Sequence, residues 1–192
     1  MATFTTFEDQ QLNYFKFLSI VLDEFTNALR QTFISLWDSK YGSLPGYQPW
    51  DDSLTVRTIF QKLEGRTVVP PSIKEWDYNE LLRSIIFSSS FGTAVSGGKK
   101  ETLSELYIAP LKLSEKSLLP NVVGKNQDES ITLSVDQLRR LRNKACHSSS
   151  TKKIDKDSFD SYIQCTKDAF AALGVSTTSV DNIVSLTEND FP

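Results

Sequence analysis

One short segment of the sequence gathers side chains that suit chemistry on a phosphodiester. Arg142, Asn143 and His147 lie within six residues of one another, and His147 is the only histidine of the chain. A guanidinium can hold the non-bridging oxygens of a phosphate in a bidentate fork and stabilise the charge of the transition state. An imidazole can take a proton from a ribose 2′-hydroxyl or give one to the leaving 5′-oxygen. With Asn143 to orient either partner, these residues are candidate catalytic groups for RNA cleavage.

The geometry of a helix sets a condition on such a site. On an ideal helix Asn143 and His147 share a face, whereas Arg142 lies about 140° away from His147. Arg142 and His147 can therefore meet within one chain only if the helix unwinds before His147. Metal-free RNA cleavage commonly uses both a base and an acid, and one chain offers a single imidazole. A twofold dimer would supply two imidazoles, so we expect a homodimer.

Basic residues surround the candidate catalytic residues. Between residues 137 and 154 the chain has six basic residues and no acidic one, although its net charge is −3. Such a local patch suggests an anionic partner that touches one face of the protein. The candidate RNA-binding residues are Arg139, Arg140, Lys144, Lys152 and Lys153. The structural alternative is a solvated helix face whose cations and His147 favour the helix C-terminus, with Arg142 paired to a carboxylate.

The elements that must position these residues are helical. Apolar residues recur every three or four positions from residue 8 to about residue 38, which is typical of one long amphipathic helix that includes Leu22 in its buried stripe. Capping patterns that begin at Asp77 and at Ser134 predict further helix starts, and Gly174 predicts a helix end. The predicted helices cover about 8–38, 53–64, 77–90, 134–147, 155–173 and 180–186. The fold expected is an all-α, up-and-down bundle of five to six helices in a single domain, 1–192.

A long irregular span precedes the predicted motif helix. Residues 91–132 are rich in Ser, Gly, Lys and Pro, and we interpret them as an insertion or mobile loop with one short helix near 103–108. Residues 92–100 resemble a phosphate-binding loop but have one residue too many before the lysine and no Ser or Thr after it, so we interpret them as a flexible loop. One histidine and two cysteines exclude a multi-His or four-Cys metal centre within one chain. The sequence thus indicates neither a cofactor nor a metal.

Composition also bears on the cellular compartment. The two cysteines, Cys146 and Cys165, are too few for a disulfide framework, and the longest apolar stretch is far too short to span a bilayer. The first ten residues lack the basic and apolar regions of a secretory signal. We therefore expect a cytoplasmic protein that does not associate with a membrane.

Residues 138–147 resemble the signature of the HEPN superfamily, which consists of an arginine, a polar residue, a short spacer and a histidine. Together with flanking segments the resemblance covers about residues 76–174, and the combination is similar to the HEPN domain of the DAZ-interacting RING-type ubiquitin ligase group. It implies a helical bundle that dimerises along the motif-bearing helices. Active members of the superfamily are metal-independent ribonucleases with a composite site at the dimer interface, and the resemblance carries that role to Arg142, Asn143 and His147.

Other HEPN domains are non-catalytic, and this leaves more than one function open. The leading hypothesis is an endoribonuclease that cleaves single-stranded RNA and leaves 2′,3′-cyclic phosphate and 5′-hydroxyl ends. The competing hypothesis is a dimerisation or protein-interaction module of a larger immune, apoptotic or ubiquitin-related protein. RNA binding without cleavage lies between them and predicts a salt-dependent affinity. The sequence departs from its nearest relatives between residues 88 and 135, where they have a shorter connection, so the insertion could cover the site or help to bind RNA.

Overall fold

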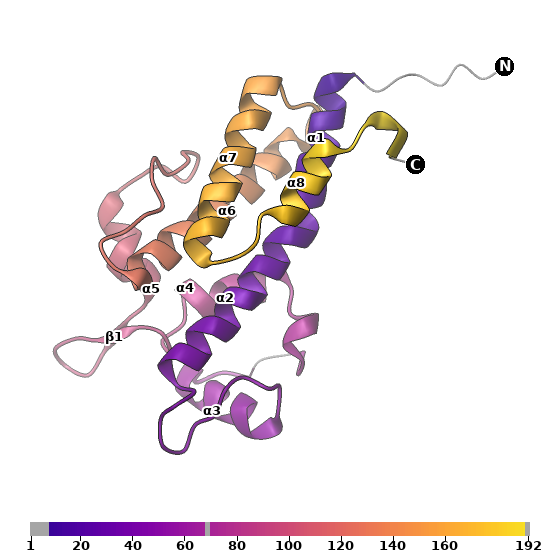
Figure 1. Ribbon diagram of the computed structural model, residues 1–192. Coiled ribbons are helices and arrows are strands. Elements are labelled where there is room, and N and C mark those ends of the chain that lie inside the picture. The colour runs from indigo at the N-terminus through magenta and orange to yellow at the C-terminus, as the bar shows by residue number, and fades with distance from the viewer. Residues whose placement is uncertain (1–7, 68–69, 191–192) are drawn as a thin grey trace.

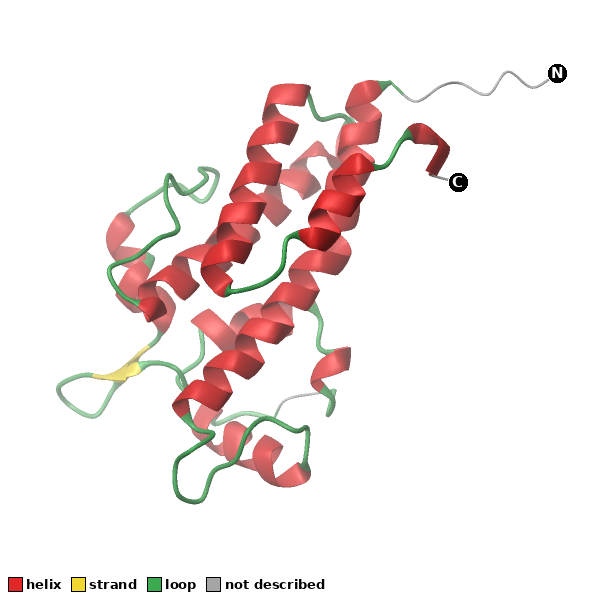
Figure 2. Ribbon diagram, viewed as in Figure 1, coloured by secondary structure: helices red, strands yellow, loops and turns green. Residues whose placement is uncertain are grey.

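The computed structural model describes residues 8–67 and 70–190, and within these ranges helices make up most of the chain (Figures 1 and 2). The helices pack into a bundle, which confirms the all-α fold expected from the sequence. Both described ends of the chain lie at the same end of the bundle (Figure 1). No helix in the described ranges combines the length and the apolar character needed to cross a membrane.

The bundle begins with one continuous helical rod. It comprises α1 (Asp9–Ser19), a π-helical turn η1 (Ile20–Glu24) and α2 (Phe25–Lys40). The expected long helix is present, but the expectation that Leu22 belongs to its buried stripe is wrong: Leu22 is 62% exposed, while Ile20 and Val21 are buried. The π turn holds one residue more than an α-helical turn, and this extra residue shifts which side of the helix is buried. A pattern with regular helical spacing does not show such a shift.

Local capping signals mark the next two helices. Ser53 caps α3 (Leu54–Glu64), and Gly65 ends it in the left-handed conformation at φ 64°. Asp77 caps α4 (Tyr78–Ile86) by accepting a hydrogen bond from the amide of Glu80. Helix α4 ends four residues before the predicted end at residue 90. Beyond it, the hydroxyl of Ser88 and the amide of Ser90 donate hydrogen bonds to the Glu64 carboxylate, at 2.5 and 2.8 Å, and these bonds hold the chain in a turn.

The predicted insertion is shorter and more ordered than expected. Residues 92–100, interpreted as a flexible loop, contribute to a small antiparallel hairpin of β1 (Thr93–Ala94) and β2 (Lys100–Glu101). The short helix expected near 103–108 is present as α5 (Leu103–Tyr107), followed by the 3₁₀ turn η3 (Ala109–Leu111). The chain then folds back beside the bundle without regular secondary structure up to residue 126 (Figure 2).

The motif helix begins earlier than the sequence predicts. Helix α6 spans Gln127–His147, and its N-cap is Asn126, which accepts a hydrogen bond from the amide of Glu129 at 2.8 Å. The expected start at Ser134 is wrong, because Ser134 lies buried inside the helix and the Gln137 side chain binds the backbone of Leu119 instead of capping. The loop predicted for 91–132 therefore ends six residues sooner.

The remaining helices complete the bundle. Asp155 caps α7 (Lys156–Leu173), Gly174 ends it at φ 70°, and α8 (Thr178–Ser185) follows. Helix α7 packs along α6, and α8 returns beside α1 (Figure 1). Short 3₁₀ turns occupy Ile73–Glu75 (η2), Ser148–Ser150 (η4) and Glu188–Asp190 (η5). Helix α6 is thus held between α7 and the insertion, which leaves its C-terminal end at the surface.

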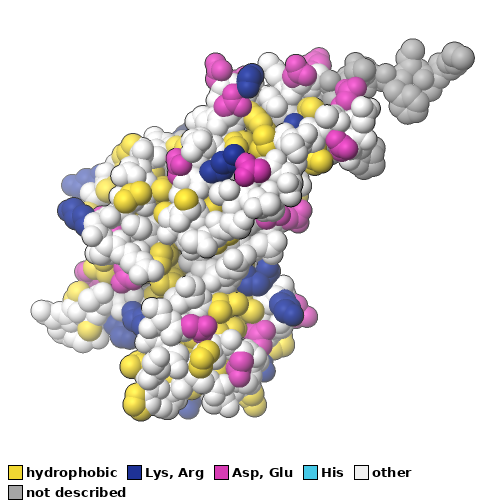
Figure 3. All heavy atoms as spheres, in the orientation of Figure 1, with side chains coloured by type: hydrophobic (Ala, Val, Ile, Leu, Met, Phe, Trp, Pro, Cys, Tyr) yellow, Lys and Arg dark blue, Asp and Glu magenta, His cyan; other side chains and the backbone are white. Residues whose placement is uncertain are grey.

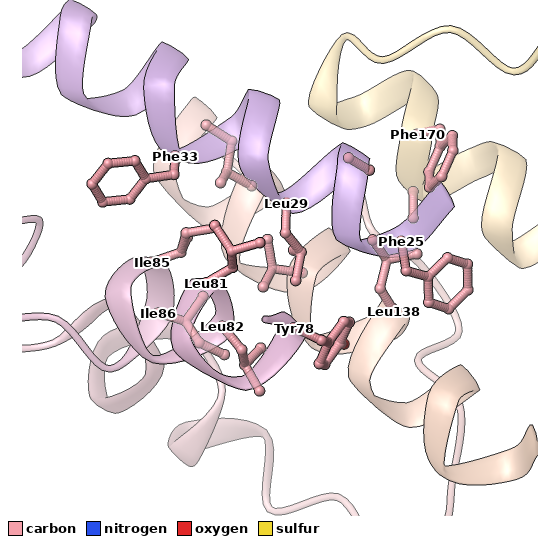
Figure 4. Packing of buried hydrophobic residues seen from close by; sticks show 14 of the residues in the cluster. Phe25, Leu29, Phe33, Tyr78, Leu81, Leu82, Ile85, Ile86, Leu138 and Phe170 are labelled. Carbon is pink, nitrogen blue, oxygen red and sulfur yellow. The ribbon is translucent and has the colours of Figure 1, made fainter. Parts of the chain in front are cut away.

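The core is continuous from α1 to α8 and contains an aromatic cluster around Phe33. Phe33 is fully buried on α2, and four rings lie edge to face with it, their centroids 4.8 to 5.7 Å from its own. These rings belong to Trp50, Phe60, Trp76 and Phe91. Figure 4 shows the adjoining layer, in which α2 faces the apolar side chains of α4. The cluster joins α2 to α3 and to the segments on both sides of α4.

Replacing the central ring should therefore destabilise the whole bundle. We expect Phe33→Ala to lower the free energy of unfolding by about 3–5 kcal/mol, because the cavity left by the ring is surrounded on several sides. Leu54→Ala is the control: Leu54 is 72% exposed, and its removal should change stability by less than about 0.5 kcal/mol. Urea denaturation measures both values. Equal effects of the two substitutions would contradict the assignment of Phe33 to the centre of the core.

Candidate functional site

A surface pocket lies against the C-terminal half of α6, and we call it the His147 pocket. Its volume is about 390 Å³, and its lining comes from α6 and from the insertion. Helix α6 contributes Arg140, Asn143, Lys144 and His147, and the insertion contributes Glu115 and Lys116. The four helical positions have the spacing i, i+3, i+4, i+7, so they form one face of α6. The pocket therefore joins part of the sequence motif to a segment far from it in the chain.

The structure brings two of the three candidate catalytic residues together. His147 is the last residue of α6 and is exposed, and Asn143 lies one turn before it, half-buried, on the same face. This placement matches the helical spacing of the motif. An imidazole at the mouth of a polar pocket can exchange protons with a bound ligand, and the neighbouring amide can donate or accept a hydrogen bond.

Arg142, the third candidate catalytic residue, lies on a different face of α6. The helix stays regular up to His147, so the unwinding that would bring both groups together in one chain does not occur. The guanidinium stacks over the ring of Tyr78, with its Cζ 4.6 Å from the ring centroid, and its Nη1 donates a hydrogen bond to Oδ1 of Asn79 at 3.4 Å. Among the described residues these partners are a ring and an amide, not the carboxylate that the structural alternative expects.

Tyr78 gives Arg142 a buried and uncharged support. The ring is 6% exposed, and within the described ranges its hydroxyl has no hydrogen-bond partner. Burial raises the pKa of Tyr78, and the nearby positive charge of Arg142 opposes that shift only in part, so the phenol stays neutral. The negative face of a neutral ring attracts a guanidinium, and stacking on the ring leaves the edge of the Arg142 group to form hydrogen bonds such as the one to Asn79.

The other two arginines of the motif helix bind acidic side chains. Asp136 is buried, and its carboxylate accepts hydrogen bonds from Nε of Arg139 at 2.7 Å and from Nε of Arg140 at 2.6 Å. Nη1 of Arg139 also pairs with Glu115. Residues 137–154 contain no acidic residue, but two carboxylates from outside this segment lie beside its guanidinium groups in the folded protein. The segment is therefore less positively charged than its own sequence suggests. On the face drawn in Figure 3, too, basic and acidic side chains are interspersed.

Arg140 holds the insertion against α6. It is 2% exposed, and its Nη1 donates hydrogen bonds to the carbonyl oxygens of Ser114 and Ser117, both at 2.6 Å. Gln137, one turn earlier, accepts from the amide of Leu119 at 2.8 Å and donates to its carbonyl at 3.1 Å. Although the sequence predicts RNA binding for Arg140, most of its guanidinium is engaged within the protein.

The three predicted RNA-binding lysines occupy different environments. Lys144 lines the His147 pocket and is half-buried. Lys152 is exposed in the connection to α7, where its φ of 51° is left-handed. Lys153 is exposed and pairs with Glu8 at 2.5 Å. Neither Lys152 nor Lys153 lines the pocket, so Lys144 is the one predicted RNA-binding lysine that the structure places beside His147.

Sequence reasoning missed the residues that build the far side of the pocket and the support of Arg142. The four-residue spacing of Asp136 and Arg140 is a local signal that predicts an ion pair on a helix. No comparable signal marks Glu115 or Lys116, because they reach the pocket through the folding of the insertion. The described residues contain no group of three or more His, Cys, Asp or Glu side chains placed to bind a metal ion.

The buried ion pair should be important for stability. We expect Arg140→Ala to lower the free energy of unfolding by about 3–5 kcal/mol, because it leaves the Asp136 carboxylate buried with one charged partner fewer. The matched control is Arg83→Ala, an exposed arginine on α4, which should have little effect. Thermal and urea unfolding of both variants measure the difference. A small effect of Arg140→Ala would show that solvent reaches the Asp136 carboxylate.

Comparison of the chain with protein-family models, with curated proteins and with solved structures finds no match. The resemblance to HEPN domains therefore rests on the motif residues of α6 and on the segments that flank them. Membership of that superfamily stays a prediction. What the structure adds is the geometry around the motif: a pocket with one imidazole, and an arginine on a neighbouring face of the same helix.

Proposed function

We propose that the protein is a HEPN-like, metal-independent endoribonuclease that acts on single-stranded RNA in the cytoplasm as a homodimer. The observation that carries the proposal is the His147 pocket, in which the only imidazole of the chain lies beside the amide of Asn143 and the ammonium of Lys144. An imidazole can transfer protons at a phosphodiester, and an ammonium and an amide can bind its anionic oxygens. The pocket is open to the surface and can admit a flexible strand.

The position of Arg142 supports a site shared between two chains. Its guanidinium lies on another face of a regular helix, supported by Tyr78, so it does not share a helix face with His147 of its own chain. In a twofold dimer that packs α6 against α6, the Arg142 face of each copy approaches the His147 face of the other. Such a dimer also supplies two imidazoles, one for each proton transfer.

The proposed reaction needs only groups that the dimer holds. One imidazole removes the proton of the ribose 2′-hydroxyl, and O2′ then attacks phosphorus. The bond from phosphorus to O5′ breaks, and the second imidazole, in its protonated form, gives a proton to O5′. Arg142 stabilises the charge that develops on the non-bridging oxygens. The products are a 2′,3′-cyclic phosphate and a 5′-hydroxyl, and no oxidant, metal or water molecule is consumed.

A second candidate function is a non-catalytic dimerisation module of a larger protein. The observation that favours it is the internal use of the basic residues: Arg139 and Arg140 pair with carboxylates, and Arg142 stacks on a tyrosine. Surface charge is thereby reduced on the helix where RNA would bind. In this case the α6 surface serves association alone, and binding of RNA without cleavage is an intermediate possibility.

Cleavage of labelled single-stranded RNA in the presence of EDTA tests the proposed activity. We expect the wild-type chain to cleave and His147→Ala to lose at least about 100-fold in rate, which is typical when a general acid or base is removed. Cys146→Ser is the matched control, because Cys146 is the exposed neighbour of His147 and should be dispensable. Equal cleavage by wild type and His147→Ala would indicate a different site or a contaminant.

Dilution tests whether the site is shared between copies. We expect the specific activity to fall when the protein is diluted below the dissociation constant of the dimer, because a monomer lacks the second half of the site. Sizing by analytical ultracentrifugation over the same concentrations gives the fraction of dimer. Activity that stays constant while the dimer dissociates would contradict a composite site. A stable dimer of wild type, Arg142→Ala and His147→Ala that never cleaves RNA would favour the dimerisation module.

A further inference from the structure

The insertion builds a fixed wall along the His147 pocket. This wall, residues 114–119, has no regular secondary structure, yet several hydrogen bonds from α6 hold it. The guanidinium of Arg140 binds two of its carbonyl groups, and the Gln137 amide binds both backbone groups of Leu119. The side chain of Leu119 is 4% exposed and packs in a small apolar cluster with Val122 and Leu133. The wall is therefore anchored at its start, its middle and its end.

The anchoring determines where two charged side chains of the wall lie. Glu115 and Lys116 are exposed and line the pocket opposite α6. Glu115 pairs with Arg139, and the hydrogen bond from that guanidinium lowers the pKa of Glu115, so the pair is charged and balanced at neutral pH. Lys116, by contrast, has no carboxylate partner among the described residues, and neither does Lys144 on the helical side of the pocket.

The charge that remains in the pocket is therefore positive and comes from two sides. Arg140 is balanced by Asp136, and Glu115 is balanced by Arg139, which leaves the ammonium groups of Lys116 and Lys144 beside His147. Two ammonium groups that face one open pocket suit an anion with several oxygen atoms. The sequence assigns RNA binding to Lys144 but says nothing of Lys116.

We propose that Lys116, presented by the fixed wall, binds a backbone phosphate of the RNA strand together with Lys144 and so places the scissile linkage beside His147. The proposal rests on the proposed function and names the part of the substrate that this pocket holds. Arg140 and Gln137 are positioning residues in this account, because they act on the RNA only by holding the wall. The insertion is thus a part of the substrate site and not a cover over it.

A strand that cannot be cleaved separates binding from catalysis. The probe is a fluorescent single-stranded RNA with 2′-O-methyl riboses, in which the attacking hydroxyl is blocked. Its affinity is measured by fluorescence anisotropy at several salt concentrations for wild type, Lys116→Ala and Lys125→Ala. Lys125 is the matched control, since it is an exposed lysine of the same insertion that does not line the pocket.

We expect Lys116→Ala to bind the probe about fivefold more weakly at about 0.1 M salt, and the slope of log affinity against log salt to fall by about 0.7, as for one lost phosphate contact on a single strand. Lys125→Ala should bind as wild type does. Because His147 is the only histidine, its imidazole NMR signals report on this pocket alone and should shift when the probe is added. In cleavage assays Lys116→Ala should raise KM with little change in kcat.

The outcomes separate this inference from the proposed function. If Lys116→Ala binds the probe as tightly as wild type, or if the His147 signals do not respond to it, the phosphate site is overturned even when the protein cleaves RNA. If binding depends on Lys116 but unmodified RNA is never cleaved, the phosphate site is supported and the nuclease proposal fails. Circular dichroism of each variant confirms that an exposed lysine, and not the fold, is what has changed.

Discussion

Asp136 and Arg140 bring opposite charges into a part of the molecule from which water is almost excluded, since neither side chain is more than 2% exposed. Two buried charges are tolerated only when they are paired and when their remaining hydrogen-bonding groups are satisfied. Asp136 meets this condition by binding Arg139 as well, and Arg140 meets it by binding the carbonyl groups of Ser114 and Ser117. The need to satisfy one ion pair thus fixes the insertion to the motif helix and gives the pocket its second side.

The same pairing divides the basic residues around the His147 pocket into two groups. Arg139 and Arg140 are engaged within the protein, whereas Lys144 and Lys116 face the pocket without a carboxylate partner in the described ranges. A count of charges along the sequence treats all of them alike. Their chemistry differs because a paired and buried guanidinium offers little to a ligand, while an ammonium at the rim of a pocket keeps its charge available.

The regularity of α6 up to His147 is a second constraint on function. It keeps Arg142 and the imidazole on separate faces of one chain and allows Tyr78 to support the guanidinium. In the proposed composite site, a second copy of the chain therefore supplies the partner group. The same geometry suits a surface that serves only for association. Both proposed functions therefore use the α6 surface, and they differ only in whether chemistry takes place there.

The sequence by itself determined the all-α fold and the helix end at Gly174, and it placed two helix starts within two residues of the Ser53 and Asp155 caps. It also determined that Asn143 and His147 share a face, because capping and helical periodicity act over a few residues. Only the tertiary structure decided the pairing of Arg139 with Glu115 and the wall of the pocket. These depend on contacts between segments 18 to 26 residues apart, such as those of Leu119 with Gln137 and of Ser114 with Arg140. No pattern of spacing within one helix contains them, since they form only when separate segments of the chain pack together.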